Sequence, residues 1–492
     1  MHRNMTTDFI ANEIYGMVMD KMHLEPKMII RRIQSKYHFN ISYAKAWRAK
    51  QRVFERRFGT CEASYDNIPR MLQIIAQRNP DSSYSFKEIP NHSGGRTILQ
   101  RAFFCLGPCV RAFQFCLPLL CIDGTFLTGK YRGTILTAIG VDGNNQLMLV
   151  AFAFIESENT DSWLWFLQLV KQHVVVGRTN VCLIGDRHAE ILQAINTLQN
   201  GGDTFPPIWS DVHNYWCTRH MGANFHDHLK NKDLMDLFKW LAAQNQERKF
   251  KTLWKMLDRL TAKHAGDDAD PPATRPFSDW IRHVPKQKWA LLYDTDGRRY
   301  GILTTNNAES YNMIMRGVRS LSLVGIVEFI VYGCAKYFRD HYMVVSRSLA
   351  NPSVVFGYKM TEYIDAKIKK SCLHDIRLMG TRERRFEVIC KGRSNRGMHR
   401  NRVVHECLLA ENGTIHCSCY KLTLLHKPCS HVIAACREAG IEPGSFVSTY
   451  YMKDTIAAAW NQEVFGFAMV DMYVQENANK VYIPDPATMI AH

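Results

Sequence analysis

The stretch between residues 118 and 166 constrains the fold more than any other part of the chain. Three apolar runs follow one another in it, at residues 119–122, Thr134–Val141 and Leu147–Ile155. The turn residues Asp142-Gly143-Asn144-Asn145 separate the second run from the third, which indicates a hairpin. The third run is apolar throughout, so we predict a strand that is buried on both faces.

A helix is expected next, because apolar residues recur at helical spacing after Asp161 or Ser162, either of which can cap it. A short apolar run at residues 181–184 then predicts a fourth strand, followed by another helix. Three antiparallel strands, a crossover helix and a fourth strand beside the first would form an RNase-H-like α/β layer. In that layer Asp123, at the end of the first strand, faces Asp186, just after the fourth.

Two carboxylates placed in this way can share Mg²⁺ or Mn²⁺, because hard cations prefer oxygen ligands. A pair of such ions supports phosphodiester chemistry by activating one oxygen and stabilising the leaving one. Glu309, in the segment TTNNAES, is the third acid of this hypothesis. Each acid also has a structural interpretation: Asp123 in a turn, Asp186 as a helix cap, and Glu309 with Asn306 in a capping box.

Four segments together resemble the plant Mutator-like element transposases of the MuDR type: DGTFLTGKYRGTILTAIGVDGNNQLMLVAFAFIESENTDSWLWFL, GDRHAEI, CTRHMGANF and TTNNAESYN. The resemblance extends over about residues 42–460. It implies a MULE transposase domain with a DDE catalytic core, whose acids fall on Asp123, Asp186 and Glu309. It also implies duplex DNA as the partner, a homo-oligomer on that DNA, and a nuclear location.

The same layout occurs in domesticated relatives, such as the far-red impaired response regulators, which act as transcription factors. A DNA-binding regulator without catalysis therefore stays open as an alternative to a transposase that cleaves and transfers DNA strands. A protein-interaction module centred on the C-terminal cysteine cluster is a third hypothesis. Members of the family usually carry a zinc-binding DNA-recognition module upstream, and we interpret the start of this chain as truncation or loss of that module.

The resemblance also includes a C-x-x-H motif after the second acid, matched by Cys217 and His220. These two residues would be half of a zinc site, and the additional His residues nearby in the sequence are His213, His226 and His228. The resemblance favours structural support of the active site, or a contact between His220 and DNA.

The last strong pattern is Cys417-Ser-Cys419, followed after nine residues by Cys429-Ser-His431. Four soft or borderline ligands suit tetrahedral Zn²⁺ with no open position, which indicates a structural ion. The pattern resembles the SWIM zinc finger, which follows the catalytic core in this transposase family. Nearby residues that would change the ligand set are His416, His426 and Cys436.

The chain is basic, with 62 Lys and Arg against 46 Asp and Glu and a net charge of +16. This balance favours a polyanionic partner such as nucleic acid. Basic residues concentrate at 27–57 and 382–402. The first stretch predicts two helices that residues 37–41 separate. Such a pair is compatible with a helix-turn-helix, or with helices that pack on the core. The expected DNA contacts on the second helix are Lys45, Arg48, Lys50 and Arg52.

These patterns divide the 492 residues into five regions. They are a basic helical region (1–90), the α/β core (100–345) with an all-helical insertion at about 222–300, a basic connecting region (346–402), the zinc finger (403–445) and an appendage (446–492). The first fifteen residues have no secretory apolar run, so the 15 cysteines are expected to be reduced thiols and metal ligands. No apolar run is long enough to cross a bilayer, and we expect no membrane partner.

Overall fold

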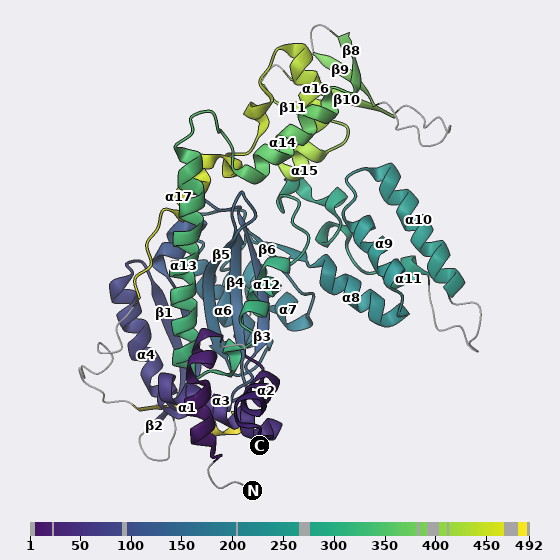
Figure 1. Cartoon of the computed structure of the whole chain (residues 1–492). Helices are drawn as coiled ribbons and strands as arrows, with labels where there is room; N and C mark the ends of the chain where they lie inside the picture. The colour runs from purple at the N-terminus through teal and green to yellow at the C-terminus, as the bar shows by residue number, and fades with distance from the viewer. Residues whose placement is uncertain are drawn as a thin grey trace.

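The computed structural model of the chain describes residues 5–21, 24–90, 96–202, 205–264, 276–380, 384–390, 403–410, 413–466 and 481–489. A mixed sheet occupies its centre (Figure 1). The strands of this sheet are β1 (Ser83–Pro90), β2 (Arg96–Cys105), β3 (Leu119–Phe126), β4 (Thr134–Val141), β5 (Leu147–Ile155), β6 (Cys182–Gly185), β7 (His213–Trp216) and β12 (Val481–Ile483). Their order is β1-β2-β5-β4-β3-β6-β7, with β12 beside β2.

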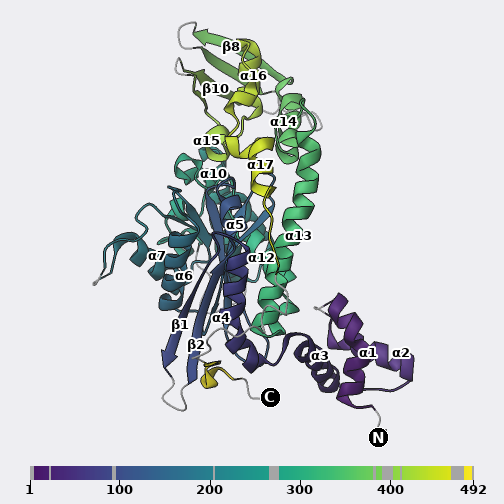
Figure 2. The same cartoon turned by 90° about the vertical axis from the view of Figure 1, so that its left-hand side faces the viewer.

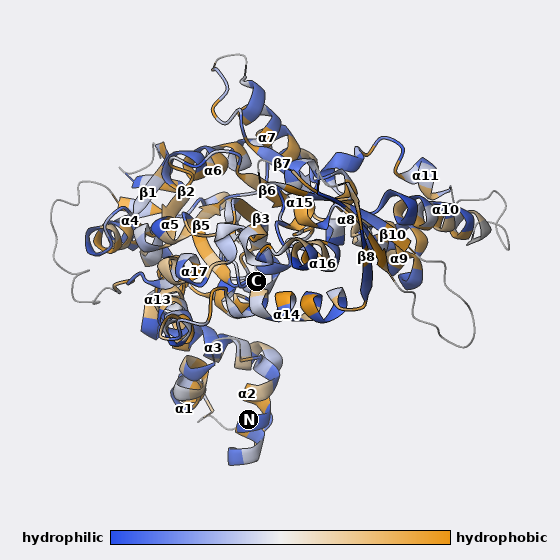
Figure 3. Cartoon of the chain, turned by 90° about the horizontal axis from the view of Figure 1, so that it is seen from above, coloured by the Kyte–Doolittle hydropathy of each residue, from blue (hydrophilic) through white to orange (hydrophobic). Residues whose placement is uncertain are grey.

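The predicted meander is present, because β3, β4 and β5 pair antiparallel in sequence order. Strand β6 then pairs parallel with β3, and β7 pairs parallel with β6. Every residue of β4 is buried, as is every residue of β5 after Leu147. This agrees with the absence of alternation in their sequences, which is typical of strands covered on both faces. Figure 3 shows apolar residues concentrated on the central strands.

Helices cover both faces of the sheet (Figure 2). Helices α6 (Thr160–His173) and α7 (Ala189–Asn200) lie on one face, and α5 (Gly107–Phe113), α12 (Asn306–Ile314) and α13 (Leu323–Leu349) lie on the other. The predicted cap of α6 at Asp161 or Ser162 is wrong. Asn159 caps this helix, and its side chain and that of Ser162 form a capping box, which leaves Asp161 to pair with Lys87 and Arg101.

The N-terminal region is helical only in its first part. Its helices are α1 (Thr7–Asp20), α2 (Pro26–Tyr37), α3 (Tyr43–Phe58) and α4 (Cys61–Arg78). Residues 83–90, which were assigned to the helical region, form the edge strand β1. Helices α1 to α3 make a small bundle at one end of the molecule (Figure 2), and Arg57 Nη2 joins it to α13 through Glu328 Oε1 at 2.5 Å.

The predicted helical insertion lies between β7 and α12. It consists of α8 (Thr218–Leu229), α9 (Lys232–Ala242), α10 (Glu247–His264), α11 (Phe277–Trp280) and the 3-10 turns η1 (Lys286–Lys288), η2 (Leu291–Tyr293) and η3 (Thr295–Gly297). It has its own aromatic core, with Phe225, Phe238 and Phe277 in mutual contact. The N–H and Oγ1 of Thr218 both donate to Leu303 O, at 2.9 and 3.1 Å, so the segment leaves and rejoins the sheet at one point. Residues 265–275 of this segment lie outside the described residues.

A second, smaller sheet lies beyond the far end of α13 (Figure 1). Its antiparallel order is β11-β10-β9-β8. The elements of this part are α14 (Tyr358–Ser371), β8 (His374–Gly380), β9 (Arg385–Cys390), β10 (Val403–Leu409), β11 (Ile415–Cys417), α15 (Lys421–Leu425) and α16 (Ser430–Ala439). The region expected to connect the core to the zinc finger therefore supplies strands β8 and β9. Of the basic stretch 382–402, residues 384–390 are described.

The described residues of the expected appendage, 446–466 and 481–489, pack on the core. Helix α17 (Lys453–Trp460) packs on α13, and β12 extends the central sheet. The Trp460 indole N–H donates to Asp142 Oδ2 at 2.7 Å, across 318 positions of sequence. This buried carboxylate also accepts from the backbone N–H groups of Asn144 and Gln146. Burial raises the pKa of Asp142 to about 6, although these hydrogen bonds oppose the shift.

The remaining described helical turns are η4 (Val318–Ser320), η5 (Pro443–Phe446), η6 (Thr449–Tyr451) and η8 (Pro486–Thr488). Within the described part of the chain, no helix combines the length and the apolar character that crossing a membrane requires.

Trp460→Phe tests whether α17 belongs to the core. The substitution removes the indole N–H and leaves the buried Asp142 carboxylate short of one donor, which costs about 1–3 kcal/mol. We expect the free energy of unfolding, measured by chemical denaturation, to fall by at least that amount. Trp240→Phe is the control, because Trp240 is 68% exposed on α9 and its loss should change stability by less than about 0.5 kcal/mol. An equal, small effect of both substitutions would contradict the docking of α17.

Candidate functional site

The pairing of β3 with β6 determines where the first two acids lie. Cys121 is the parallel partner of Ile184, and Asp123 and Asp186 follow two residues later on each strand. Both carboxylates therefore come to the same edge of the sheet. Burial raises the pKa of Asp123, and the neighbouring charge of Asp186 raises it further, while His220, the Gly124 N–H and Asn312 act in the opposite direction.

Helix α12 brings the third acid to this edge. His220 lies between Asp186 and Glu309, with Nδ1 4.0 Å from Asp186 Oδ1 and Nε2 3.4 Å from Glu309 Oε1. One turn after Glu309, Asn312 Nδ2 donates to Asp123 Oδ2 at 2.8 Å. The structure thus brings Asp123, Asp186 and Glu309 together. Asn312 was not predicted, although its position three residues after Glu309 places both side chains on one face of the helix.

The three acids do not have the purely structural roles considered above, namely a turn, a helix cap and a capping box. Asp123 lies inside β3, and helix α7 is capped at His188 and not at Asp186. Helix α12 begins after Thr305, without a side-chain cap, so Glu309 does not form a capping box with Asn306. Glu309 instead accepts from Thr305 Oγ1 at 3.3 Å and forms an ion pair with Arg219.

A fourth carboxylate, Glu158, borders the same edge. It lies against Gly124, where any Cβ atom would collide with Glu158 Oε1. Burial raises the pKa of Glu158, and the charges of Asp123 and Asp186 raise it further. Sequence reasoning missed this acid, because its place depends on how the residues after β5 fold against Gly124 of β3.

The C-x-x-H pair reaches the acids from the start of α8. Cys217 is 1% exposed, and its Sγ accepts a hydrogen bond from the Thr305 N–H at 3.3 Å. The Thr305 hydroxyl lies 3.3 Å from this sulfur and from Glu309 Oε1, and it donates its one proton to either of them. Burial raises the pKa of the thiol, but the hydrogen bonds from His220 and Thr305 bring it below its ordinary value. The interaction with Cys217 in turn raises the pKa of His220, against the effect of burial. Ligand atoms of Cys217, His220 and Glu309 all lie within 4.8 Å of one another.

Cys417, Cys419, Cys429 and His431 form a separate, buried cluster between β11 and the start of α16. Cys417 Sγ lies 3.5 Å from Cys419 Sγ and 3.7 Å from Cys429 Sγ. His431 Nδ1 lies 3.6 and 3.7 Å from the sulfurs of Cys417 and Cys429. Usual bond lengths around tetrahedral Zn²⁺ require S···S separations of about 3.8 Å and S···N separations of about 3.5 Å. The four side chains therefore fit a zinc ion.

Two further histidines surround this cluster and were not predicted. The His405 ring stacks on His431 with ring centres 4.0 Å apart, and its Nδ1 lies 3.2 Å from Ser418 Oγ. His374 Nε2 lies 3.0 Å from Ser430 Oγ. Burial and the charge of His431 lower the pKa of both imidazoles to about 4.

The three residues considered as alternative zinc ligands lie outside the cluster. His416 is exposed, and Cys436 lies further along α16. His426 bonds to Gly297 O at 3.0 Å and stacks on Tyr300. The histidines considered as further ligands beside Cys217 and His220 also lie elsewhere. His213 is on β7 and contacts Arg298, and His226 and His228 lie in the last turn of α8.

The four predicted DNA contacts on α3 differ in their surroundings. Lys50 is buried, and burial lowers its pKa to about 8. Arg52 is exposed but pairs with Asp8 and Glu55. Arg48 is exposed, and Lys45 is partly exposed.

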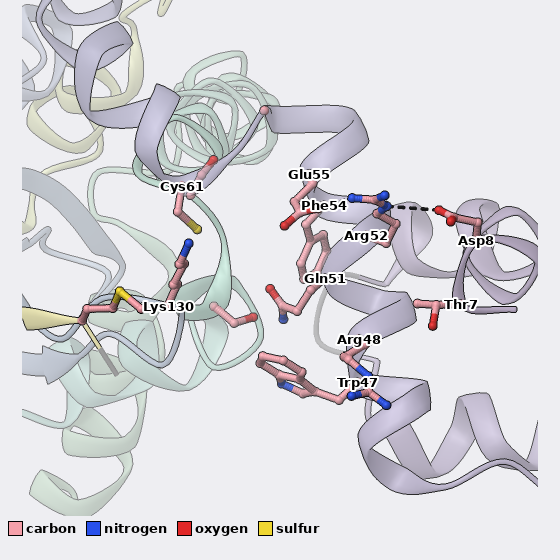
Figure 4. Close-up of a pocket in the computed structure, with 14 residues that line it drawn as sticks. Thr7, Asp8, Trp47, Arg48, Gln51, Arg52, Phe54, Glu55, Cys61 and Lys130 are labelled. Atoms are coloured by element: carbon pink, nitrogen blue, oxygen red, sulfur yellow. Dashed lines mark hydrogen bonds and ion pairs between the residues drawn. The ribbon is translucent and has the colours of Figure 1, made fainter. Parts of the chain in front are cut away.

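A cavity of about 570 Å³ separates α3 from the core, and Arg48 and Arg52 line it together with Trp47 and Lys130 (Figure 4). None of the acids at the end of β3 and β6 lines this cavity.

Residues 119–224 match the family model of the MULE transposase domain. The match supports a Mutator-like transposase-family protein. The matched segment runs from β3 into α8 and so contains Asp123, Asp186, Cys217 and His220, whereas Glu309 lies beyond it. No curated protein matches the chain.

Zinc in the C-terminal cluster can be tested by exchanging single thiols. Cys429→Ser removes one ligand, so we expect the purified chain to lose one zinc ion relative to the unmodified chain, measured by elemental analysis after dialysis. Cys436→Ser is the matched control, because it replaces another buried thiol on α16 that is outside the cluster. Zinc content that is unchanged in Cys429→Ser would contradict the assignment.

Proposed function

We propose that the chain is a DNA transposase of the Mutator-like class, with metal-dependent strand cleavage and transfer at transposon ends. The observation that carries the proposal is the convergence of Asp123, Asp186 and Glu309 at one edge of the central sheet. The first two lie in the segment that matches the MULE transposase domain. The sheet order, with β6 parallel to the first strand of an antiparallel meander, supports an RNase-H-like DDE core.

The electrostatics of the acids support a divalent-cation site. Four carboxylates gather at the edge, and two of them, Asp123 and Glu158, have pKa values raised by burial and by their acidic neighbours. Repulsion of this kind is relieved when a cation binds, and carboxylate oxygens are the ligands that Mg²⁺ and Mn²⁺ prefer. Asp123, Asp186 and Glu309 would hold the ions. Bound there, the ions supply activation of the attacking oxygen and stabilisation of the leaving oxygen.

The neighbouring side chains orient these acids. Asn312 donates to Oδ2 of Asp123, and the Gly124 N–H donates to Oδ1 at 3.0 Å, so both oxygens of this carboxylate are oriented. His220 stands between Asp186 and Glu309, within 4.0 Å of an oxygen of each carboxylate. Geometry of this kind reduces the reorganisation that the chemical step requires.

Duplex DNA is the proposed partner. The net charge of +16 supports this proposal, as do the exposed Arg31 and Arg48 of the N-terminal bundle. The C-terminal cluster would be a SWIM-type zinc finger with a structural ion, because its four ligands leave no open position. Assembly as a homo-oligomer on DNA and a nuclear location belong to the same proposal.

Charge-removing substitutions test the catalytic acids. Asp123→Asn, Asp186→Asn and Glu309→Gln keep the size of each side chain but remove the charge that a divalent cation needs. We expect each to abolish Mn²⁺-dependent cleavage of DNA that carries transposon ends, with thermal unfolding without metal nearly unchanged. The three losses should not add, because the acids act as one site.

Asp227→Asn, at a side chain that is 72% exposed on α8, is the control and should retain full activity. A fully active Glu309→Gln would exclude Glu309 as the third acid. An unmodified chain that binds this DNA but does not cleave it would favour a regulator without catalysis.

Salt-dependent binding tests the DNA contacts. Arg31 and Arg48 are exposed, and among the described residues no ion pair involves them, so both are available to phosphate. The double variant Arg31→Ala/Arg48→Ala should bind duplex DNA more weakly. It should also reduce the slope of log K against log salt by about 1.8, because each lost phosphate contact contributes about 0.9.

Arg52→Ala is the matched control, since Asp8 and Glu55 already neutralise this guanidinium. Its salt slope should equal that of the unmodified chain. Equal slopes for the double variant and the unmodified chain would show that the α2–α3 pair does not contact DNA.

A further inference from the structure

Cys217, His220 and Glu309 meet beside the acids, although they come from two separate helices. Cys217 is the residue before α8, and His220 lies in the first turn of that helix, so the spacing of three places both side chains on one side. Glu309 projects from the first half of α12. Their ligand atoms lie within 4.8 Å of one another, and His220 Nε2 and Glu309 Oε1 are 3.4 Å apart.

We propose that Cys217, His220 and Glu309 form a binding site for a transition-metal ion of the Zn²⁺ class, distinct from the C-terminal zinc cluster. Thiolate and imidazole ligands favour such ions over Mg²⁺, which prefers oxygen alone. Three protein ligands leave one position of a tetrahedral ion open to water or substrate. The site goes beyond the proposed function, because it binds its ion whether or not the chain cleaves DNA.

The surroundings of the thiol support this assignment. Cys217 is almost fully buried, yet the Thr305 N–H donates to its sulfur, and the Thr305 hydroxyl lies 3.3 Å from both that sulfur and Glu309 Oε1. Donors of this kind stabilise a thiolate, which is the form that binds metals.

The orientation of the imidazole supports it as well. Nε2 faces Glu309, and Nδ1 lies 4.0 Å from Asp186 Oδ1. Metal-binding histidines usually direct their second nitrogen to a carboxylate, which fixes the ring. Asp186 stands where that carboxylate is needed. His220 Nδ1 is buried and makes no hydrogen bond within the described residues, so a small movement would complete the arrangement.

The guanidinium of Arg219, which balances the charge of Glu309, can move away. Arg219 pairs with Glu309, and its side chain is 53% exposed, whereas that of Glu309 is 14% exposed. An exposed arginine can swing into solvent at little cost when a metal ion takes over the charge of the carboxylate. Glu309 would then be a ligand both of this ion and of the divalent cations held by Asp123 and Asp186. In this way it would connect the C-x-x-H motif to the carboxylates at the end of β3 and β6.

Cobalt provides the test, because a thiolate ligand gives Co²⁺ a sulfur-to-metal charge-transfer band in the near ultraviolet that an oxygen-only site lacks. The full chain is first given one equivalent of Zn²⁺, which fills the closed C-terminal cluster, and is then titrated with Co²⁺. We expect the unmodified chain to bind Co²⁺ with this band, and Cys217→Ser to lose the band. Cys182→Ser, at a buried thiol on β6 outside the site, should keep it.

His220→Gln provides a second measurement in case Cys217→Ser does not fold. His220 is 28% exposed, so the substitution should be tolerated, and we expect Co²⁺ affinity to fall at least tenfold. No band in the unmodified chain, an equal band in Cys217→Ser, or unchanged affinity in His220→Gln would each overturn the site. A chain that shows the band but never cleaves DNA overturns the proposed function alone. A chain that cleaves DNA but shows no band overturns this site alone.

Discussion

The parallel pairing of β3 with β6 is the interaction on which the site depends. It brings two positions that are 63 residues apart in the sequence, Asp123 and Asp186, to one edge of the sheet. A shift of one residue would turn one carboxylate to the opposite face, because side chains alternate along a strand. The register is held by the buried apolar residues of both strands, which contact helices on either side. The core of the sheet therefore determines the geometry of the acids.

The helical insertion can be large because it does not disturb this edge. Its two ends meet at the hydrogen bonds between Thr218 and Leu303, and its aromatic core is its own. The chain thus returns to the sheet at the place from which α12 can reach the acids. Cys217 and Thr305, one on each side of the insertion, contact one another directly. The C-x-x-H motif links the base of the insertion to the candidate site.

The sequence predicted those features that a short stretch of residues determines. Continuous apolar runs predicted β4 and β5 with their observed bounds, and ligand spacing predicted the four side chains of the C-terminal cluster. The sequence did not predict the contacts that only tertiary structure creates. Asp142 was interpreted as a turn residue, but it is also the buried acceptor for Trp460. Lys50 was expected to contact DNA, but it lies on the buried face of α3. Glu158 and Asn312 join the acids only after β5 and α12 have packed.

The measurement that most directly tests the central claim is anomalous diffraction from crystals of the chain soaked in Mn²⁺. If Asp123, Asp186 and Glu309 form one divalent-cation centre, a strong anomalous peak must lie within bonding distance of Asp123 and Asp186, with Glu309 beside it. Mn²⁺ bonds to carboxylate oxygen at short range, so the position of the peak identifies the ligands without reference to activity. Ordered carboxylates with no Mn²⁺ peak between them would contradict the account.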